Sequence, residues 1–481
     1  MTPSAVALGF IVAIVAIGSA IGFYAGARRK MDLEQWTVAG RGFGTVLMWL
    51  LMAGEVYTTF SFLGAAGWAY SRGGPTLYIL AYLSLCYIVA FFILPPVWQF
   101  GRQHKLQTQS DFFAWRYRSK YLAAAVSLVG IVFMIPYLEL QLTGLGIIVE
   151  IASFDGIGRA PAMLVSVALL AGFVLANGLR AIAWVSVLKD ALMIVAALAV
   201  GIGIPYTFFG GIGPMFAALA HAKPAHLVMP GATANLGHSW FITTVILTSL
   251  GVCLWPHNFG AAYGAKSADT LRRNAMVMPI YSLSLALMIF VGFAAVLEMP
   301  GLRDGDLSLL AMVRKAFPPW FLGVIGGAGA LTAMVPAAIL TLSCATLFAK
   351  NIVRPIFAPG MNDHEVGRLA RIMVVVVSSI SLLLALRGSS TLVALLLLGY
   401  AGITQLFPGV VLGLFWERAS AAGIFLGLGA GVALVAVLAA TKHDPFFGMN
   451  AGFVGLCLNF AIAIGGSLLV RSQSPVDSVA A

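Results

Sequence analysis

Four ionisable side chains stand near the middle of long apolar stretches: Glu55, Glu139, Lys189 and Asp190. A charged residue at the centre of a membrane helix costs about 2.5–3.5 kcal/mol on the insertion scale. Residues of this kind usually line an ion or substrate pathway, relay protons or pair with another helix. Glu55 lies inside the polar run Met52–Thr59. It is therefore a candidate for handling an ion or a substrate, with pairing to a neighbouring helix as the alternative.

Lys189 is the second charge candidate. Lys189 and Asp190 are adjacent, so on a helix their side chains point about 100° apart and cannot meet the same partner. Ser186 and Lys189 are three residues apart and share a helix face. A role for Lys189 in transport and a role in a structural pair both remain open.

The composition of the chain indicates what kind of secondary structure carries these residues. The chain has 481 residues, of which 60% are hydrophobic and 9% are charged, against about 25% charged in a soluble domain. This excludes a soluble globule and predicts an all-α polytopic protein embedded in the lipid bilayer. The net charge of +11 comes from basic residues in short loops between apolar stretches, so nucleic acid is not an expected partner. Neither a metal-ligand cluster nor a paired nucleophile and base is visible, so we expect no cofactor and no enzyme.

Thirteen stretches are apolar enough to cross a bilayer, which takes about 20 residues per helix. They cover roughly 5–27, 44–70, 77–99, 121–151, 161–179, 182–208, 239–256, 275–298, 320–349, 371–387, 390–416, 420–441 and 450–470. With the N-terminus outside, the basic residues of the cytoplasmic loops clearly outnumber those of the outer loops. The positive-inside rule therefore predicts an N-out, C-in orientation, and the expected location is the inner (cytoplasmic) membrane.

The predicted spans divide the chain into two halves. Residues 43–208 form a first repeat of five helices and residues 239–416 a second. An odd number of helices per half gives the halves opposite orientations, which is an inverted-topology transporter repeat. Residues 209–238 are then an external loop. Residues 1–42 supply an extra helix and a cytoplasmic loop, and residues 417–481 supply two extra helices and a short tail.

The first helix of each half carries a break signal. In the first half it is the polar run Met52–Thr59, and in the second it is Ser249–His257, which contains Gly251 and Pro256. Gly and Pro loosen the helical ladder, and membrane proteins tolerate such breaks only where the backbone faces protein or a water-filled cavity. Corresponding breaks predict a transport site at the bilayer midplane. For His257, just beyond the second break, capping or hydrogen bonding is the expected role.

The span at roughly 320–349 is rich in glycines and hydroxyls. The glycines Gly323, Gly326, Gly327 and Gly329 predict close helix packing. The Thr and Ser hydroxyls that follow are possible ligands for a small hard cation. The alternative is that they bond back to the carbonyl four residues earlier.

Short motifs stand at the ends of three predicted spans: Ala39–Gly44, Pro256–His257, and Phe407–Gly409 followed by Gly413–Arg418. In these motifs the chain resembles the sodium:solute symporter family. Further runs make it most similar to the bacterial monocarboxylate uptake permeases, namely Gly54–Thr58, Met134–Tyr137, Gly178–Ala181 with Lys189–Asp190, and Arg272–Asn274. The resemblance implies a five-plus-five inverted repeat like that of the leucine transporter, with alternating access driven by a cation gradient.

The resemblance also implies a cation site. Its ligands fall on the backbone carbonyls of Gly54, Tyr57 and Ala337 and on the hydroxyl of Thr341. This chain departs from the family at Leu340, which lacks a ligand hydroxyl, and at Ser186, where well-known sodium-coupled members carry Asp. The coupling ion is therefore open between Na⁺, which is favoured, and H⁺, for which Glu55 and Lys189 are the charge candidates.

The family's substrate positions fall on Ser61, Thr248, Val252, Tyr400 and Gln405. The expected function is symport that imports a small monocarboxylate such as lactate, pyruvate or a short-chain acid. Broken helices direct their positive N-terminal dipole ends at anions, and Lys189 adds positive charge. A neutral or zwitterionic solute, such as an amino acid, is the alternative. The sequence does not determine the oligomeric state.

Overall fold

The computed structural model describes residues 1–26, 41–176, 179–388 and 390–470. Within these ranges the chain is helical, and its β-structure is limited to the isolated bridges Phe43–Ala265 and Phe446–Met449. The longer helices are α1 (Pro3–Gly26), α5 (Tyr78–Gln103), α7 (Lys120–Ala152), α8 (Arg159–Ala176), α9 (Leu179–Phe209), α13 (Ala268–Leu283), α14 (Leu285–Glu298), α16 (Pro319–Thr346), α17 (Asp363–Arg387), α20 (Ala421–Ala440) and α21 (Ala451–Leu469). The other α-helices are α3 (Thr45–Gly54), α4 (Ala65–Arg72), α6 (Gln109–Tyr117), α10 (Ile212–Ala222), α11 (His238–Gly251), α12 (Pro256–Tyr263), α15 (Ser308–Ala316), α18 (Leu392–Ile403) and α19 (Phe407–Phe415).

Most of the predicted spans appear as long apolar helices. In the described residues, ten segments are long and apolar enough to cross a membrane, and the bent pair of α11 and α12 makes an eleventh. The other two predicted spans correspond to α3 with α4 and to α8. Helix α3 has only 10 residues, and α8 (18 residues) borders positions 177 and 178, which lie outside the described residues. The chain is a multi-pass membrane protein, while the number thirteen and the N-out orientation stay predictions.

Small residues let α16 pack closely on α1, as the sequence predicts. A Cβ added at Gly323 would lie 2.6 Å from the carbonyl oxygen of Ala7, and one at Gly327 would lie 2.7 Å from the Ile14 side chain. Gly329 on another face of α16 is equally close to the ring of Phe62, at 2.5 Å. These contacts fix α16 between α1 and the segment after α3.

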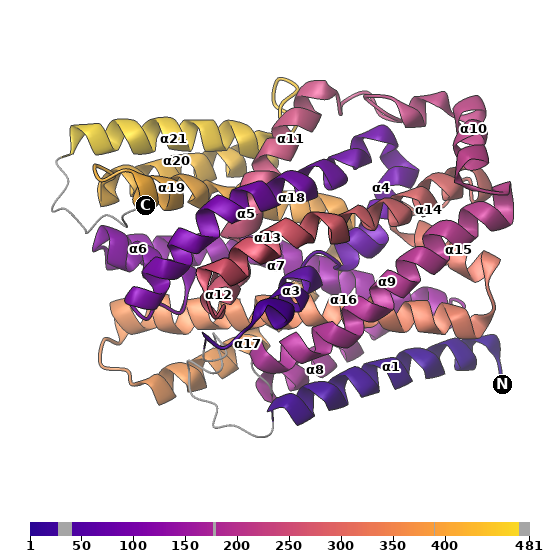
Figure 1. The fold of residues 1–481 in the computed structure, drawn as a ribbon, viewed down its shortest axis with the longest axis horizontal. Coiled ribbons are helices and arrows are strands. Elements are labelled where there is room, and N and C mark those ends of the chain that lie inside the picture. The colour runs from indigo at the N-terminus through magenta and orange to yellow at the C-terminus, as the bar shows by residue number, and fades with distance from the viewer. Residues whose placement is uncertain (27–40, 177–178, 389, 471–481) are drawn as a thin grey trace.

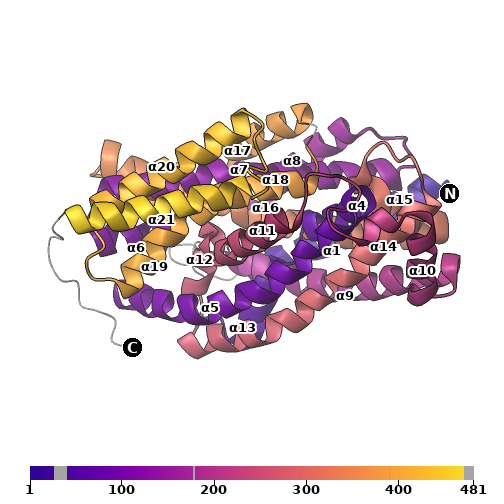
Figure 2. The same cartoon turned by 90° about the horizontal axis from the view of Figure 1, so that it is seen from above.

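Two short helices lie at opposite ends of the molecule. Helix α6 follows α5 and precedes α7, and α15 follows α14 and precedes α16. Figure 1 shows α6 at one end and α15 at the other, and Figure 2 agrees. The start of α1 lies at the α15 end and the end of α21 at the α6 end. An inverted repeat with an odd number of crossings predicts this arrangement. Helices α20 and α21 run side by side outside the two predicted halves.

Both predicted breaks are present. Helix α3 ends at Gly54, and the chain continues through a non-helical turn into the short helix η2 (Phe60–Gly64) and then α4. Helix α11 ends at Gly251, and the short helix η5 (Val252–Leu254) leads to α12 at an angle of 45°. Trp255, with φ −57° and ψ 127°, makes the bend, since Pro256 restricts the preceding residue to extended backbone.

Candidate functional site

A cavity of about 60 Å³ lies between the two breaks. The first break supplies Glu55, Val56 and Thr58, and the second supplies Val252, Trp255 and His257. Side chains of α5, α7, α13 and α18 complete the wall. About 10–15 Å³ suffices to hold one water, so the cavity has room for a solute of a few non-hydrogen atoms.

Aromatic rings form one wall of the cavity. Tyr400 packs edge-on against Tyr82, with ring centroids 5.7 Å apart, and against Trp255 at 5.3 Å. Trp255 in turn lies 4.9 Å from Tyr137. These contacts connect α18, α5, η5–α12 and α7, so the wall depends on helices that are far apart in the sequence.

Glu55 and His257 are in contact in the wall of the cavity. The His257 Nε2 and Glu55 Oε2 atoms are 3.1 Å apart, and their side chains are 1% and 8% exposed. The angles do not satisfy hydrogen-bond geometry, and no ring nitrogen or carboxylate oxygen of the pair has another such partner among the described residues. The sequence selected both residues separately but did not predict their contact. The expected capping or hydrogen-bonding role of His257 is not observed.

Lys189 reaches the end of α3. Its ammonium donates a hydrogen bond to the Gly54 carbonyl and lies 3.7 Å from Asp190 Oδ1, with both side chains buried. Tyr281 donates to the same Asp190 oxygen at 3.3 Å. A Cβ at Gly54 would lie 3.0 Å from Ser186 Oγ. Ser186 and Lys189 therefore share the face that meets Gly54, as their spacing predicts.

Three of the four predicted cation ligands form hydrogen bonds within the protein. Thr341 donates its hydroxyl to the Ala337 carbonyl at 2.7 Å, which is the back-bonding alternative. The Gly54 carbonyl accepts from Lys189, whereas at Tyr57 it is the side-chain hydroxyl, not the predicted carbonyl ligand, that bonds to Ser284. The assignment of all four positions as cation ligands stays a prediction.

The five predicted substrate positions divide into two groups. Val252 and Tyr400 line the cavity. Ser61 instead bonds within the first break, donating to the Val56 carbonyl at 2.7 Å, and Thr248 donates to Thr244 at 2.6 Å. Gln405 donates to the Ala401 and Gly452 carbonyls, both at 3.0 Å, and so connects α18 to α21.

Several residues of the wall were not predicted as site residues. They are Thr58, Tyr82, Tyr137, Trp255, Asn258 and Asn274. Thr58, Tyr137 and Asn274 belong to runs on which the permease resemblance rests, so that resemblance was the available signal. Two parts of the motifs lie outside the described residues: Gly178 of the permease-like run, and Ala39 and Gly40 of the family motif Ala39–Gly44.

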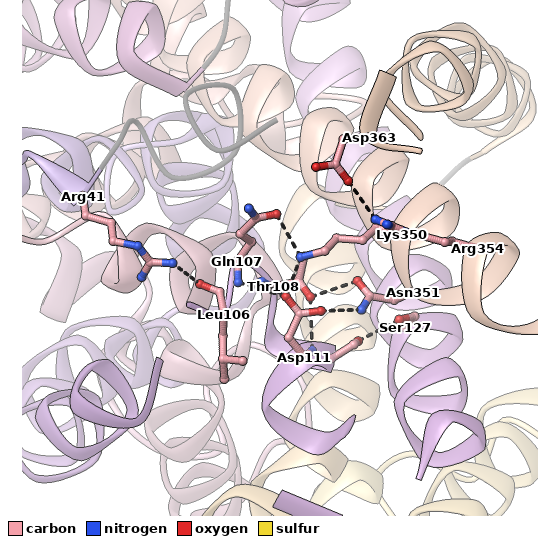
Figure 3. Close-up of polar contacts among 11 residues, drawn as sticks. Arg41, Leu106, Gln107, Thr108, Asp111, Ser127, Lys350, Asn351, Arg354 and Asp363 are labelled. Carbon is pink, nitrogen blue, oxygen red and sulfur yellow. Dashed lines mark hydrogen bonds and ion pairs between the residues drawn. The ribbon is translucent and has the colours of Figure 1, made fainter. Parts of the chain in front are cut away.

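A polar network lies at the α6 end (Figure 3). We call Gln107, Thr108, Asp111, Lys350 and Asn351 the Asp111 network. The Asp111 carboxylate accepts hydrogen bonds from Lys350 and Asn351, each at 2.7 Å, and from the Gln107 and Thr108 amides at 2.9 and 3.0 Å. Burial alone raises the pKa of Asp111, but the Lys350 charge and these hydrogen bonds outweigh it and hold the pKa below its usual value.

The Asp111 network is connected to the cavity through His257. A second, smaller cavity is lined by Gln107 and Thr108 of the network and by Pro256 and His257 of α12. His257 also lines the central cavity. His257 is thus shared by the walls of both cavities.

Comparison with known proteins identifies the family. The family model described as "Sodium:solute symporter family" matches residues 36–431. The chain is 43% identical over 478 residues to the "Uncharacterized symporter YhjB" of Bacillus subtilis (strain 168), covering 97% of both chains. It is 28% identical to the "Monocarboxylate transport permease protein" of Rhizobium johnstonii, covering 98% of both.

A solved structure supports the fold. A Na⁺-coupled sialic acid symporter superposes with a TM-score of 0.80 over 99% of both chains, at 17% identity. At that identity the likeness shows the fold alone. From the family match and the 43% identical relative together, the chain belongs to the sodium:solute symporter family.

Proposed function

We propose that this symporter imports a small monocarboxylate, such as lactate, pyruvate or a short-chain acid, together with a cation. The observation that carries the proposal is the cavity of about 60 Å³ between two broken helices. Its size suits a solute of a few non-hydrogen atoms, and broken helices present positive dipole ends to an anion. The relative named as a monocarboxylate transport permease supports the same substrate class.

We propose Na⁺ as the favoured coupling ion, bound by the Gly54, Tyr57 and Ala337 carbonyls and the Thr341 hydroxyl. Family membership supports this assignment. H⁺ is the second candidate, and one observation favours it. The Lys189 ammonium donates to the Gly54 carbonyl, so it supplies a positive charge where the family places an ion.

A neutral or zwitterionic solute is the alternative substrate. The observation that favours it is the Glu55 carboxylate in the cavity wall, because a carboxylate attracts an amino group and repels an acid. His257 offsets that repulsion only when it is positively charged.

Uptake into proteoliposomes tests the proposal. The full chain is reconstituted and uptake of labelled pyruvate is measured with an imposed Na⁺ gradient and, separately, with an imposed pH gradient. Unlabelled lactate, propionate, alanine and proline serve as competitors. We expect accumulation above the external concentration under the Na⁺ gradient, with competition by the acids only. Accumulation that only the pH gradient drives would assign H⁺ instead, and competition by the amino acids alone would favour the alternative substrate.

A further inference from the structure

Basic side chains gather where the chain leaves one apolar span and enters the next. The span Gly74–Gln103 ends, and the span Lys120–Ala152 begins, on either side of α6. The basic residues at these two ends are all exposed, and they are Arg102, Lys105, Arg118 and Lys120. We call these four residues the α6 basic surface. The ends of a spanning helix lie at the level of the lipid headgroups, so this surface lies at that level too.

The α6 basic surface has no acidic counterpart. Among the described residues, none of its four side chains forms an ion pair or a hydrogen bond. The one acidic residue between positions 101 and 120 is Asp111, which is buried and bound to Lys350. The α15 end of the molecule differs (Figure 1). There the basic residues that pair with a carboxylate are Arg159, Arg303, Arg314 and Lys315.

Contacts within the protein hold the α6 basic surface together. The His104 ring stacks on Trp115, with ring centroids 4.2 Å apart, and this contact joins the end of α5 to α6. Tyr117 at the other end of α6 donates to the Gly409 carbonyl at 2.6 Å. The Asp111 network fixes the start of the same helix. The four positive charges are therefore brought together without a ligand.

Aromatic rings border the charges. Trp115 is 52% exposed and Tyr121 is 64% exposed. The Lys120 ammonium lies 5.3 Å from the centre of the Tyr121 ring, and the Arg102 guanidinium lies 5.2 Å from that of Trp98. Trp and Tyr are enriched where a membrane meets water, because their rings are apolar and carry a polar group. Such a surface suits a ligand with a charged head and an apolar tail.

We propose that the α6 basic surface binds the headgroup phosphate of an anionic phospholipid, with Trp115 and Tyr121 against the start of its acyl chains. Guanidinium and ammonium groups bind phosphate through charge-assisted hydrogen bonds. Each basic residue near an anionic membrane surface strengthens binding by about fivefold. A zwitterionic lipid carries its own cation and gains less. An acidic protein segment would meet the same charges, but two spans end here, so the ligand in place is lipid.

Lipid binding to the purified full chain in detergent tests the proposal. The probes are dioleoylphosphatidylglycerol, which is anionic, and dioleoylphosphatidylcholine, which has the same chains and no net charge. Native mass spectrometry measures the bound fraction of each lipid across a titration. The test variant combines Lys105→Gln, Arg118→Gln and Lys120→Gln. We expect wild type to prefer phosphatidylglycerol by about tenfold or more, and the test variant to lose most of that preference.

The matched control removes three exposed positive charges elsewhere, through Lys223→Gln, Arg387→Gln and Lys442→Gln. It should keep the preference of wild type. A charge-retaining variant, Lys105→Arg with Lys120→Arg, should keep it as well. Raising the salt to about 0.5 M KCl should reduce the preference of wild type, because salt screens exposed charges.

Several outcomes would overturn the proposal. They are equal binding of both lipids to wild type, a preference within twofold of wild type in the test variant, and an equal loss in the matched control. Displacement of phosphatidylglycerol by inorganic phosphate at equal concentration would also overturn it, since it would indicate an ion site. If the test variant does not fold, Lys120→Gln alone should lower the preference by about fivefold, and no change there would reject the surface. The transported solute does not enter this experiment, so its result is independent of the proposed function.

Discussion

At the residue scale, the contact between Lys189 and Gly54 bears most directly on coupling. The buried Lys189 ammonium donates to a backbone carbonyl at a helix break, at one of the positions where we propose the cation site. Asp190 lies beside the Lys189 ammonium and accepts a hydrogen bond from Tyr281. Lys189 and the predicted ligands Ala337 and Thr341 lie on different helices, so the two candidate charge carriers are separable by mutation.

Thr341→Ala is expected to weaken the Na⁺ dependence of uptake. The substitution removes a predicted ligand oxygen, so half-maximal uptake should need about tenfold more Na⁺, the effect of about 1.4 kcal/mol. The measurement is initial uptake rate against Na⁺ concentration in proteoliposomes. Thr346→Ala is the matched control, because Thr346 lies on the same helix and its hydroxyl also bonds back, to Leu342 at 2.8 Å. An unchanged Na⁺ dependence in Thr341→Ala removes that residue from the site.

Lys189→Ala is expected to abolish any uptake that a pH gradient drives. The variant removes the buried ammonium that donates a hydrogen bond to the Gly54 carbonyl. Uptake is compared under imposed pH and Na⁺ gradients, with Lys223→Ala at an exposed loop residue as the control. Full pH-driven uptake in Lys189→Ala would rule out the proton role of this lysine.

At the element scale, the Asp111 network joins α6 to η7 (Leu347–Phe357), the continuation of α16. Thr108 and Asp111 form a capping box that starts α6, and the same carboxylate binds Lys350 and Asn351 from η7. One side chain thus begins a helix and attaches it to another. Gln107 and Thr108 also line the smaller cavity beside His257, so the network borders the region next to the second break.

Asp111→Asn is expected to lower the stability of the purified protein by about 1.5–3 kcal/mol, the range for hydrogen bonds to a charged group. The matched control is Asp363→Asn in the same region, since Asp363 is 71% exposed and its pair with Arg354 at 2.8 Å lies at the surface. Thermal unfolding in detergent measures both variants. Equal melting temperatures for Asp111→Asn and wild type would contradict a stabilising network.

The pH dependence of that difference follows from the lowered pKa of Asp111. A carboxyl whose pKa is lowered by folding stabilises the protein above its unfolded pKa, about 3.9 for Asp, and loses that contribution as the pH falls through the folded value. The gap in melting temperature between wild type and Asp111→Asn should therefore stay constant from pH 8 to pH 5. A gap that closes by pH 6 would show that another group is responsible.

At the scale of the whole molecule, the two predicted halves meet at the cavity, and corresponding elements of the two halves lie at opposite ends of the molecule. Each predicted half begins with a broken helix and places a short helix, α6 or α15, after its second span. These short helices lie at opposite ends of the molecule, and so do the start of α1 and the end of α21 (Figure 1). An inverted repeat over 43–208 and 239–416 would give this arrangement, and that division of the chain stays a prediction.

The predicted N-out, C-in orientation is testable with fusions. Green fluorescent protein attached after Ala481 should fluoresce, because it folds in the cytoplasm, while alkaline phosphatase at the same position should be inactive. The reciprocal result, active phosphatase and no fluorescence, would reverse the orientation. Fusions in the loop at 209–238 should give the opposite pattern from those at the C-terminus.

The sequence alone determined the class of the protein, most of its spans and both breaks. Apolar length and low charge are properties of continuous stretches, and Gly and Pro act on the backbone locally, so α3 ends at Gly54 and α12 begins at Pro256 where the residue types predict. Short sequence motifs were also sufficient to identify the family. The same local signal made Glu55, Lys189 and His257 candidates, since a polar residue in an apolar stretch is visible without any structure.

Only the tertiary structure decided which of these residues meet. Glu55 and His257 come from different halves, and their approach to 3.1 Å depends on how α3 and α12 pack. For the same reason Tyr82 and Tyr137 form part of the cavity wall, whereas Ser61 and Gln405 bond to nearby backbone instead. A local sequence pattern fixes the period and ends of a helix, but the distance between residues on separate helices depends on packing across the whole bundle.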